Sequence, residues 1–116
     1  VLENGYPGMP MKRLDNRILR AICAEARALG LIVVVHTTSP DDVREAVEAG
    51  AHGVEHGSVW LPLPDPLIAL MKEKQVFYDP TLHVFEGTRM LRAGDFKRLE
   101  DSLLNQAVPR DLMRDT

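Results

Sequence analysis

The chain has 116 residues, of which 45% are hydrophobic and 27% are charged, and its formal net charge is −3. This composition is typical of one ordinary globular unit, and so mild and mixed a charge argues against nucleic-acid and membrane partners. No apolar run approaches the length of a membrane span, and the one cysteine, Cys23, excludes an internal disulfide and a cysteine-based zinc site.

The beginning of the chain reads as the end of a strand followed by a loop. Residues 1–3 are the last part of this predicted strand, and residues 4–13 are rich in glycine and proline, which favour turns. Because the chain opens on Val1 inside such a strand, we expect it to be a piece of a longer protein. A signal peptide upstream is left open, so the compartment is undetermined, with the cytoplasm as the default.

The first predicted helix covers about residues 16–29. Asp15 can cap its N-terminus, and Gly30 suits the left-handed position that follows a helix. Cys23 falls on the apolar side of this helix, so we expect a buried, inert thiol rather than a nucleophile. The positions predicted to share the core face are Ile18, Ile22, Ala26 and Leu29.

A strand and a second helix follow. Residues 31–36 form a continuous apolar run that ends in a histidine, which is typical of a parallel strand buried on both faces. Ser39 is predicted to cap a helix whose first residue is Pro40, since the two acidic residues that come next favour a helix start. The helix is expected to end before Gly50. Its predicted inward residues are Val43, Ala46 and Val47.

The same pattern then recurs. Residues 51–56 form a short predicted strand and residues 57–64 a loop. Residues 76–78 form another predicted strand, which ends at Asp79 and Pro80. Asp65 and Pro66 repeat the cap-then-proline start of a helix between the two strands. The residues predicted to line that helix are Leu67, Ile68 and Met71.

Strand–loop–helix units that recur about every 20 residues imply parallel strands joined by right-handed crossovers. A (β/α)8 barrel and a doubly wound sheet both satisfy this pattern. Because a complete barrel needs about 250 residues, the pattern over residues 1–82 predicts an α/β fold that is either part of a (β/α)8 TIM barrel or a smaller open sheet. Residues 83–116 look helical but irregular, and we expect a lid or tail there.

Two histidines end consecutive strands of this pattern. His36 and His56 would both lie at the carboxyl edge of a parallel sheet, where sites form in such folds. Adjacent strands are about 4.8 Å apart, so two imidazoles there could contact one ion, with zinc–nitrogen bonds of about 2.0–2.1 Å. A single histidine at a strand end is ordinarily a hydrogen-bonded loop residue. Two at equivalent places make a metal site a serious hypothesis.

Other polar residues near the strands have mainly structural predictions. His52 opens its strand at the opposite edge, where a surface role is expected, and Glu55 alternates away from His56 toward the helix side. Asp79 precedes a proline, as turn-starting residues do. Thr37 and Thr38 are expected to bond local backbone or the following helix start.

Three side chains in the predicted loops above the strands could line a substrate pocket, although rings in loops commonly serve only packing. They are Tyr6, Trp60 and His83.

The segment GLIVVVHTTSPDDVREAVEAGAHGVEHG resembles the fifth- and sixth-strand region of the metal-dependent amidohydrolase superfamily, and within it the imidazolonepropionase-like and prolidase-like branch. In that branch a strand ending in V.VH is followed by a short helix ending in AG and then by G.EHG. The later FYDPTL resembles the seventh-strand region. The resemblance covers roughly residues 14–82, and the two-histidine block is its more specific part.

The resemblance implies a (β/α)8 barrel with one or two divalent metal ions, often zinc, and hydrolysis of an amide or other C–N bond in a small molecule or dipeptide. His36 and His56 match its metal-binding histidines of strands five and six, which act with a carboxylated lysine from strand four. That lysine, the His-x-His of strand one and the general-base aspartate of strand eight are absent here, and Asp79 is on the wrong strand to replace the last. We therefore assign no catalytic residue and expect the isolated chain to be inactive.

Two alternatives stay open. A non-catalytic βα scaffold or binding module would hold both histidines in ordinary hydrogen bonds. A metal-free TIM-barrel enzyme would need a strand-end lysine or a phosphate-binding glycine loop, and the sequence shows neither. An incomplete barrel would expose strand edges and apolar helix faces, so homo-oligomer formation is a further expectation.

Overall fold

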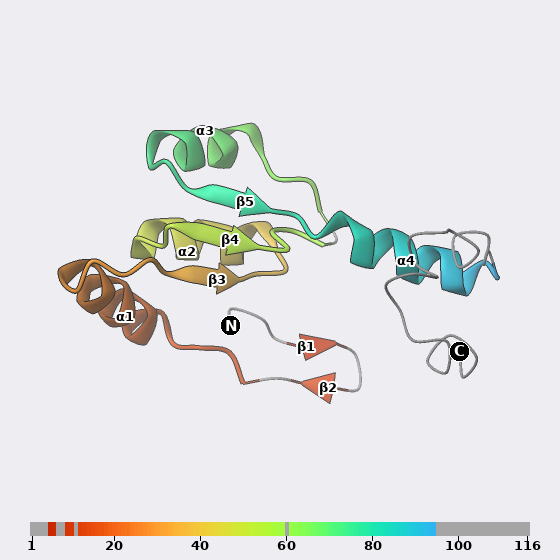
Figure 1. Cartoon of the computed structure of the whole chain (residues 1–116), viewed down its shortest axis with the longest axis horizontal. Coiled ribbons are helices and arrows are strands. Elements are labelled where there is room, and N and C mark those ends of the chain that lie inside the picture. The colour runs from red at the N-terminus through yellow and green to blue at the C-terminus, as the bar shows by residue number, and fades with distance from the viewer. Residues whose placement is uncertain (1–4, 7–8, 11, 60, 95–116) are drawn as a thin grey trace, which may run out of the picture. The chain divides into compact units, whose positions relative to one another are not determined.

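The computed structural model describes residues 5–6, 9–10, 12–59 and 61–94 of the chain (Figure 1). The chain divides into two compact units, Val1–Thr81 and Leu82–Thr116, and each is described by itself. The elements of the first unit are β1 (Gly5–Tyr6), β2 (Met9–Pro10), α1 (Asn16–Ala28), β3 (Val34–His36), α2 (Pro40–Ala49), β4 (Gly53–Glu55), α3 (Asp65–Glu73) and β5 (Phe77–Asp79).

The first unit is built on a parallel sheet with the strand order β3-β4-β5. The three arrows point the same way in Figure 1, so their carboxyl ends lie at one edge. This confirms the predicted parallel βα pattern over residues 34–79. Each strand has three residues, and β3 and β4 are shorter than the predicted strands at 31–36 and 51–56.

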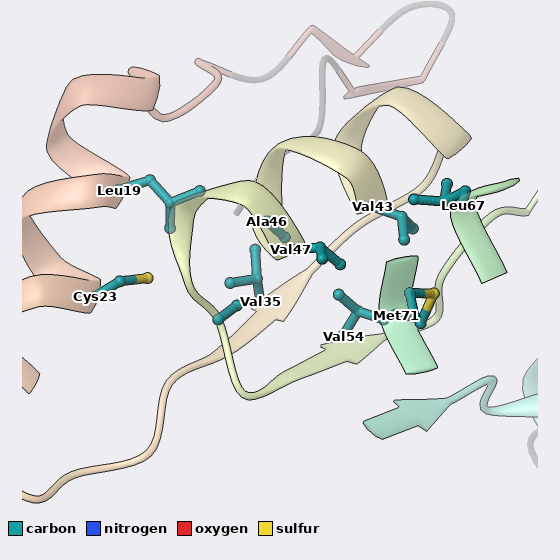
Figure 2. Packing of buried hydrophobic residues seen from close by; sticks show 10 residues of the cluster. Leu19, Cys23, Val35, Val43, Ala46, Val47, Val54, Leu67 and Met71 are labelled. Carbon is teal, nitrogen blue, oxygen red and sulfur yellow. The ribbon is translucent and has the colours of Figure 1, made fainter. Parts of the chain in front are cut away.

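Helix α2 covers one face of this sheet and carries the core. Its inward residues are those predicted, and Val43 and Ala46 are completely buried. Figure 2 shows them packed against Val35 of β3 and Val54 of β4. Burying a valine side chain from water is worth about 1.5–3 kcal/mol. Helices α1 and α3 complete the cluster with Leu19, Cys23, Leu67 and Met71.

The opposite face of the sheet is open, so the prediction that residues 31–36 are buried on both faces was wrong. Val34 and Phe77 face away from α2 and are 38% and 47% exposed. Between them lies Gly53, in register with both. The Phe77 ring occupies the space where a Cβ of Gly53 would be, so glycine lets this ring lie across β4. A continuous apolar run identifies a strand but does not show that a second layer covers it.

Helix α1 begins and ends near the predicted positions but buries a different stripe. Asp15 caps it by accepting a hydrogen bond from the Arg17 backbone N–H, and Gly30 follows it with φ of 69°. The buried residues are Leu19, Cys23 and Ala26, whereas three of the four predicted core positions are exposed. The exposed ones are Ile18, Ile22 and Leu29.

The reason is that α1 is apolar on a wide face and α2 covers only one side of it. The uncovered side borders an apolar groove, whose lining includes Ala21 and Leu31 beside the exposed isoleucines. Cys23 is on the covered side and is 1% exposed, as predicted for an inert thiol. Burial raises the pKa of this thiol above its ordinary value.

Both ends of α2 are formed as predicted. Ser39 Oγ accepts from the Asp42 N–H at 3.2 Å, and Asp42 Oδ2 accepts from the Ser39 N–H at 3.0 Å, which is a capping box. Pro40 is the first helical residue. Gly50 ends the helix with φ of 93°, a conformation that favours glycine.

An ion-pair network ties the segment before α1 to α2. The Arg13 guanidinium donates to Asp42 Oδ1 at 2.8 Å and to Glu45 Oε2 at 3.0 Å. Burial raises the pKa of Asp42, but hydrogen bonds from Arg13, Ser39 and Thr38 outweigh it, so the pKa lies below its ordinary value. The hydrogen bond from Arg13 is also the main reason why the pKa of Glu45 lies below its ordinary value.

The remaining elements correct three details. Residue Asp65 is the first residue of α3 and Pro64 is its N-cap, with no side-chain cap bond. In that helix Leu67 and Met71 are buried, but Ile68 is 37% exposed. Within the predicted loop at 4–13, the strands β1 and β2 pair in antiparallel fashion.

The second unit contains α4 (Leu82–Arg92), a regular helix of 11 residues that was predicted only as an irregular helical segment. The expectations for residues 1–3 and for residues 95–116 lie outside the described residues. Within the described part of the chain, no helix combines the length and the apolar character needed to cross a membrane.

The network around Arg13 predicts how stability depends on pH. The ordinary pKa values of aspartate and glutamate side chains are about 3.9 and 4.3. In the folded protein the pKa values of Asp42 and Glu45 both lie below these ordinary values. Their contribution to the free energy of unfolding is therefore complete above those values and is lost as the pH falls through the lower folded values. We expect Arg13→Met to lower the free energy of unfolding by about 1–2 kcal/mol at neutral pH. The variant should also lose less stability than the wild type as the pH is lowered into the acid range, which urea unfolding at a series of pH values measures.

Arg17→Met is the matched control, because the side chain of Arg17 is 91% exposed in its pair with Asp15. It should leave both the free energy of unfolding and its pH profile nearly unchanged. Identical profiles for the two variants would show that the Arg13 network does not stabilise the fold.

Candidate functional site

The two strand-end histidines are in contact at the carboxyl edge of the sheet. His36 is the last residue of β3, and His56 follows β4 directly. Their ring centroids are 4.4 Å apart and the ring planes meet at 74°, an edge-to-face arrangement. Both side chains are half-buried. The structure therefore brings together the two residues that were predicted to act together.

The turn that carries His56 is held by bonds from both neighbouring strand ends. The backbone N–H of His56 donates to the carbonyl of Asp79 at 2.8 Å. From the other side, the Thr37 hydroxyl, completely buried, donates to the carbonyl of Gly57 at 2.9 Å. The Val59 N–H donates to the Thr38 carbonyl at 3.0 Å. The prediction for Thr38 is confirmed, because its hydroxyl donates to Asp42 Oδ2 at the start of α2 at 3.3 Å. The prediction for Thr37 was wrong, because its hydroxyl bonds the backbone of the neighbouring strand end, 20 residues away, and not local backbone.

Gly57 allows this turn to close against β5. Its φ is 67°, and the Tyr78 ring fills the space that a Cβ of Gly57 would occupy. The Tyr78 hydroxyl donates to the carbonyl of His56 at 3.4 Å, at the long end of hydrogen-bond distances. A side chain at position 57 would be strained by the backbone and would displace the ring.

Thr81 is a site residue that the sequence did not reveal. Its Oγ1 lies 2.6 Å from Nδ1 of His56, and its N–H donates to Asp79 Oδ1 at 3.0 Å. Thr81 has φ of 44°, which is rare for a β-branched residue. The turn-starting role predicted for Asp79 is confirmed by its bond to Thr81, but no sequence pattern predicts a threonine in this conformation.

The carboxylates of Glu55 and Asp79 share the open face with His36, and the position of Glu55 differs from the prediction. Glu55 is in register with His36, and Asp79 is in register with Glu55. Because neighbours in register point to the same face, Glu55 points away from the helices rather than toward them. The error arose because alternation was counted from His56, which lies beyond the strand, in the left-handed region with φ of 64°.

The prediction of a surface role for His52 was wrong. It is half-buried, and its Nδ1 accepts a hydrogen bond from the Val33 backbone N–H at 3.1 Å. Its own backbone N–H donates to the Val33 carbonyl at 2.8 Å. His52 therefore ties the start of β4 to the segment before β3.

The three side chains predicted to line a substrate pocket come from different parts of the chain. Tyr6 is a residue of β1, and His83 is an exposed residue of α4 in the second unit. Trp60 lies outside the described residues. Their role in substrate binding remains a prediction.

The donor set fits part of a metal site. Two imidazoles are ligands that zinc takes, and carboxylates beside them are its other common oxygen donors. Among the described residues, however, no group of three or more histidine, cysteine, aspartate or glutamate side chains could hold a metal ion. His36 and His56 can thus supply two ligands but not a complete coordination shell.

Comparison with solved structures relates the chain to a dipeptidase. No protein-family model matches the chain, and no curated protein matches it either. The chain is similar to the crystal structure of a Xaa-Pro dipeptidase with methionine bound in its active site, with a TM-score of 0.56 and 25% sequence identity. The match covers 72% of this chain and 20% of the dipeptidase chain, so the chain spans about a fifth of that protein.

Two glycines with nearly equal φ angles test the packing at the histidine turn. Gly30→Ala meets nothing within 4 Å at φ of 69°, so it should cost only the strain of a left-handed alanine, about 1–2 kcal/mol. Gly57→Ala adds the clash with Tyr78 and should cost about 1–3 kcal/mol more. Chemical denaturation of both variants measures the difference, and equal losses would mean that Tyr78 does not pack on Gly57.

Proposed function

We propose that this chain is a segment of a metal-dependent hydrolase of the amidohydrolase superfamily, from its imidazolonepropionase-like and prolidase-like branch. One observation carries the proposal: His36 and His56 are in ring contact at the carboxyl ends of adjacent parallel strands. The similarity to a Xaa-Pro dipeptidase, itself a hydrolase of a peptide bond, supports it.

The proposal includes a larger (β/α)8 barrel, and the exposed apolar surface supports it. In a barrel the face opposite the helices becomes the packed interior, which would bury Val34 and Phe77. A neighbouring helix in the outer ring would cover the exposed stripe of α1, Ile18 and Ile22 included. Exposed apolar side chains on two faces are costly in water, and a complete barrel would bury both sets.

His36 and His56 would hold a divalent cation, with zinc the first candidate, and the complete protein would hold one or two ions. When bound, such an ion would supply a water of lowered pKa and a polarising charge for the carbonyl of an amide. The residues of this chain bind and orient: each neutral imidazole offers one nitrogen, and Thr37 and Asp79 hold the turn behind His56. The general base and remaining ligands would come from other parts of the protein.

The proposed substrates are small amides, and dipeptides are the first class to test. The chain is similar to a protein described as acting on Xaa-Pro dipeptides. Tyr6, Trp60 and His83 are proposed as substrate contacts from the loops. The division into a barrel segment, residues 1–82, and a helical lid or tail belongs to the same proposal.

Zinc titration of the chain tests whether the histidine pair binds metal. Followed by NMR of 15N-labelled histidine side chains, zinc should shift the His36 and His56 resonances and leave His52 unchanged, because Nδ1 of His52 is engaged by a backbone N–H. His36→Ala and His56→Ala should each abolish the effect. Binding should be weaker than at structural zinc sites, since those have four protein ligands.

Hydrolysis is tested on the protein encoded by the whole reading frame. With zinc, it should cleave Xaa-Pro dipeptides or acylated amino acids, and loss of either imidazole should lower kcat/KM by at least about 100-fold. Zinc that shifts no histidine resonance, together with activity that survives both substitutions, would favour the non-catalytic βα scaffold instead.

A further inference from the structure

We propose that Thr81 is a positioning residue for His56: its Oγ1 accepts the Nδ1–H of His56 and so keeps Nε2 as the nitrogen that carries the lone pair. The inference rests on the proposed function, in which that lone pair serves a metal ion. Neither the family resemblance nor the dipeptidase similarity assigns a role to this threonine.

The first observation is the contact itself. Thr81 Oγ1 and His56 Nδ1 are 2.6 Å apart, and both residues are half-buried. A neutral imidazole has one N–H and one acceptor nitrogen, and the hydrogen bond made by one nitrogen decides the role of the other. In metal sites the ring N–H of a ligating histidine is ordinarily bonded to such an oxygen, which orients the ring.

The second observation is that the backbone is strained on both sides of this contact. Among the described residues, the non-glycine positions with positive φ are His56 at 64°, Thr81 at 44° and Gln75 at 56°. Two of these three residues are therefore the partners of one hydrogen bond. Positive φ is costly for a β-branched residue and persists where surrounding contacts enforce it.

The third observation is that one residue enforces both conformations. The carbonyl of Asp79 accepts the His56 N–H at 2.8 Å, and its Oδ1 accepts the Thr81 N–H at 3.0 Å. Asp79 thereby fixes the hydroxyl of Thr81 opposite the ring of His56. His56, Asp79 and Thr81 therefore contact one another, and these contacts hold the imidazole of His56 in one orientation.

His52 provides a contrast within the same chain. Its Nδ1 accepts from the Val33 backbone N–H at 3.1 Å, so in its neutral form the proton must be on Nε2. We therefore expect different neutral tautomers at two histidines that are four positions apart: the proton should be on Nε2 of His52 and on Nδ1 of His56. His52 serves as an internal reference for the tautomer measurement.

The test is histidine-tautomer NMR on the full chain without metal. Side-chain 15N shifts are recorded in alkaline buffer, where imidazoles are neutral. Wild type should show Nδ1–H at His56 and Nε2–H at His52. Thr81→Val has the same branching and shape but no hydroxyl, so His56 should lose its fixed Nδ1–H form, while Thr81→Ser should retain it. The His52 resonance reports whether each variant is folded.

Two results would overturn the inference. Nε2–H at His56 in the wild type would mean that the Thr81 hydroxyl donates instead and holds the metal-binding nitrogen protonated. An unchanged Nδ1–H form in Thr81→Val would mean that Thr81 does not select the tautomer. If Thr81→Val loses the His52 signature of folding, Thr81→Ala and Thr81→Ser supply the same comparison with a smaller side chain.

A zinc arm separates this inference from the proposed function. Thr81→Val should weaken zinc binding about 10–100-fold and Thr81→Ser should restore it. Equal zinc affinities in wild type and Thr81→Val would overturn the positioning role. Zinc binding by none of the proteins, with the Nδ1–H form present in wild type and lost in Thr81→Val, would contradict the metal function and leave the Thr81–His56 bond supported.

Discussion

The contact between α2 and one face of the parallel sheet is the constraint on which the rest of the structure depends. Val35 and Val54 must face α2 to be buried, and both are at most 4% exposed. Because side chains alternate along a strand, their neighbours His36 and Glu55 are forced onto the other face. The packing that stabilises the fold thus places polar groups on the open face, at the edge where the strands end.

The strand ends are then joined by side chains as well as by the sheet. Thr37 reaches across to the carbonyl of Gly57, and Asp79 reaches back to His56 and forward to Thr81. These bonds hold three consecutive strand ends in one arrangement. Residues with positive φ gather at this edge, which is a frequent property of functional sites because such conformations need strong surrounding contacts.

The exposed face of the sheet, opposite α2, is also relevant to the proposed hydrolase. The exposed Val34 and Phe77 lie on the same face as His36, so a layer that covered this apolar surface would lie against the face that carries His36. Enclosure from water strengthens electrostatic interactions within a site. In the proposed barrel, the same closure would complete both the core and the ligand set.

The sequence by itself determined what depends on neighbouring residues. These features are the Ser39 N-cap and glycine end of α2, the N-cap of α1, and three strands ending at nearly regular intervals. Because parallel strand ends meet at one edge, it also predicted the proximity of His36 and His56. Only the tertiary structure decided which stripe of α1 is buried, which face Glu55 occupies and how His52 is bonded, since each depends on a partner distant in the chain. The contact of Thr81 with His56 belongs to this second group, because its backbone is held in a conformation that threonine rarely adopts unless surrounding contacts require it.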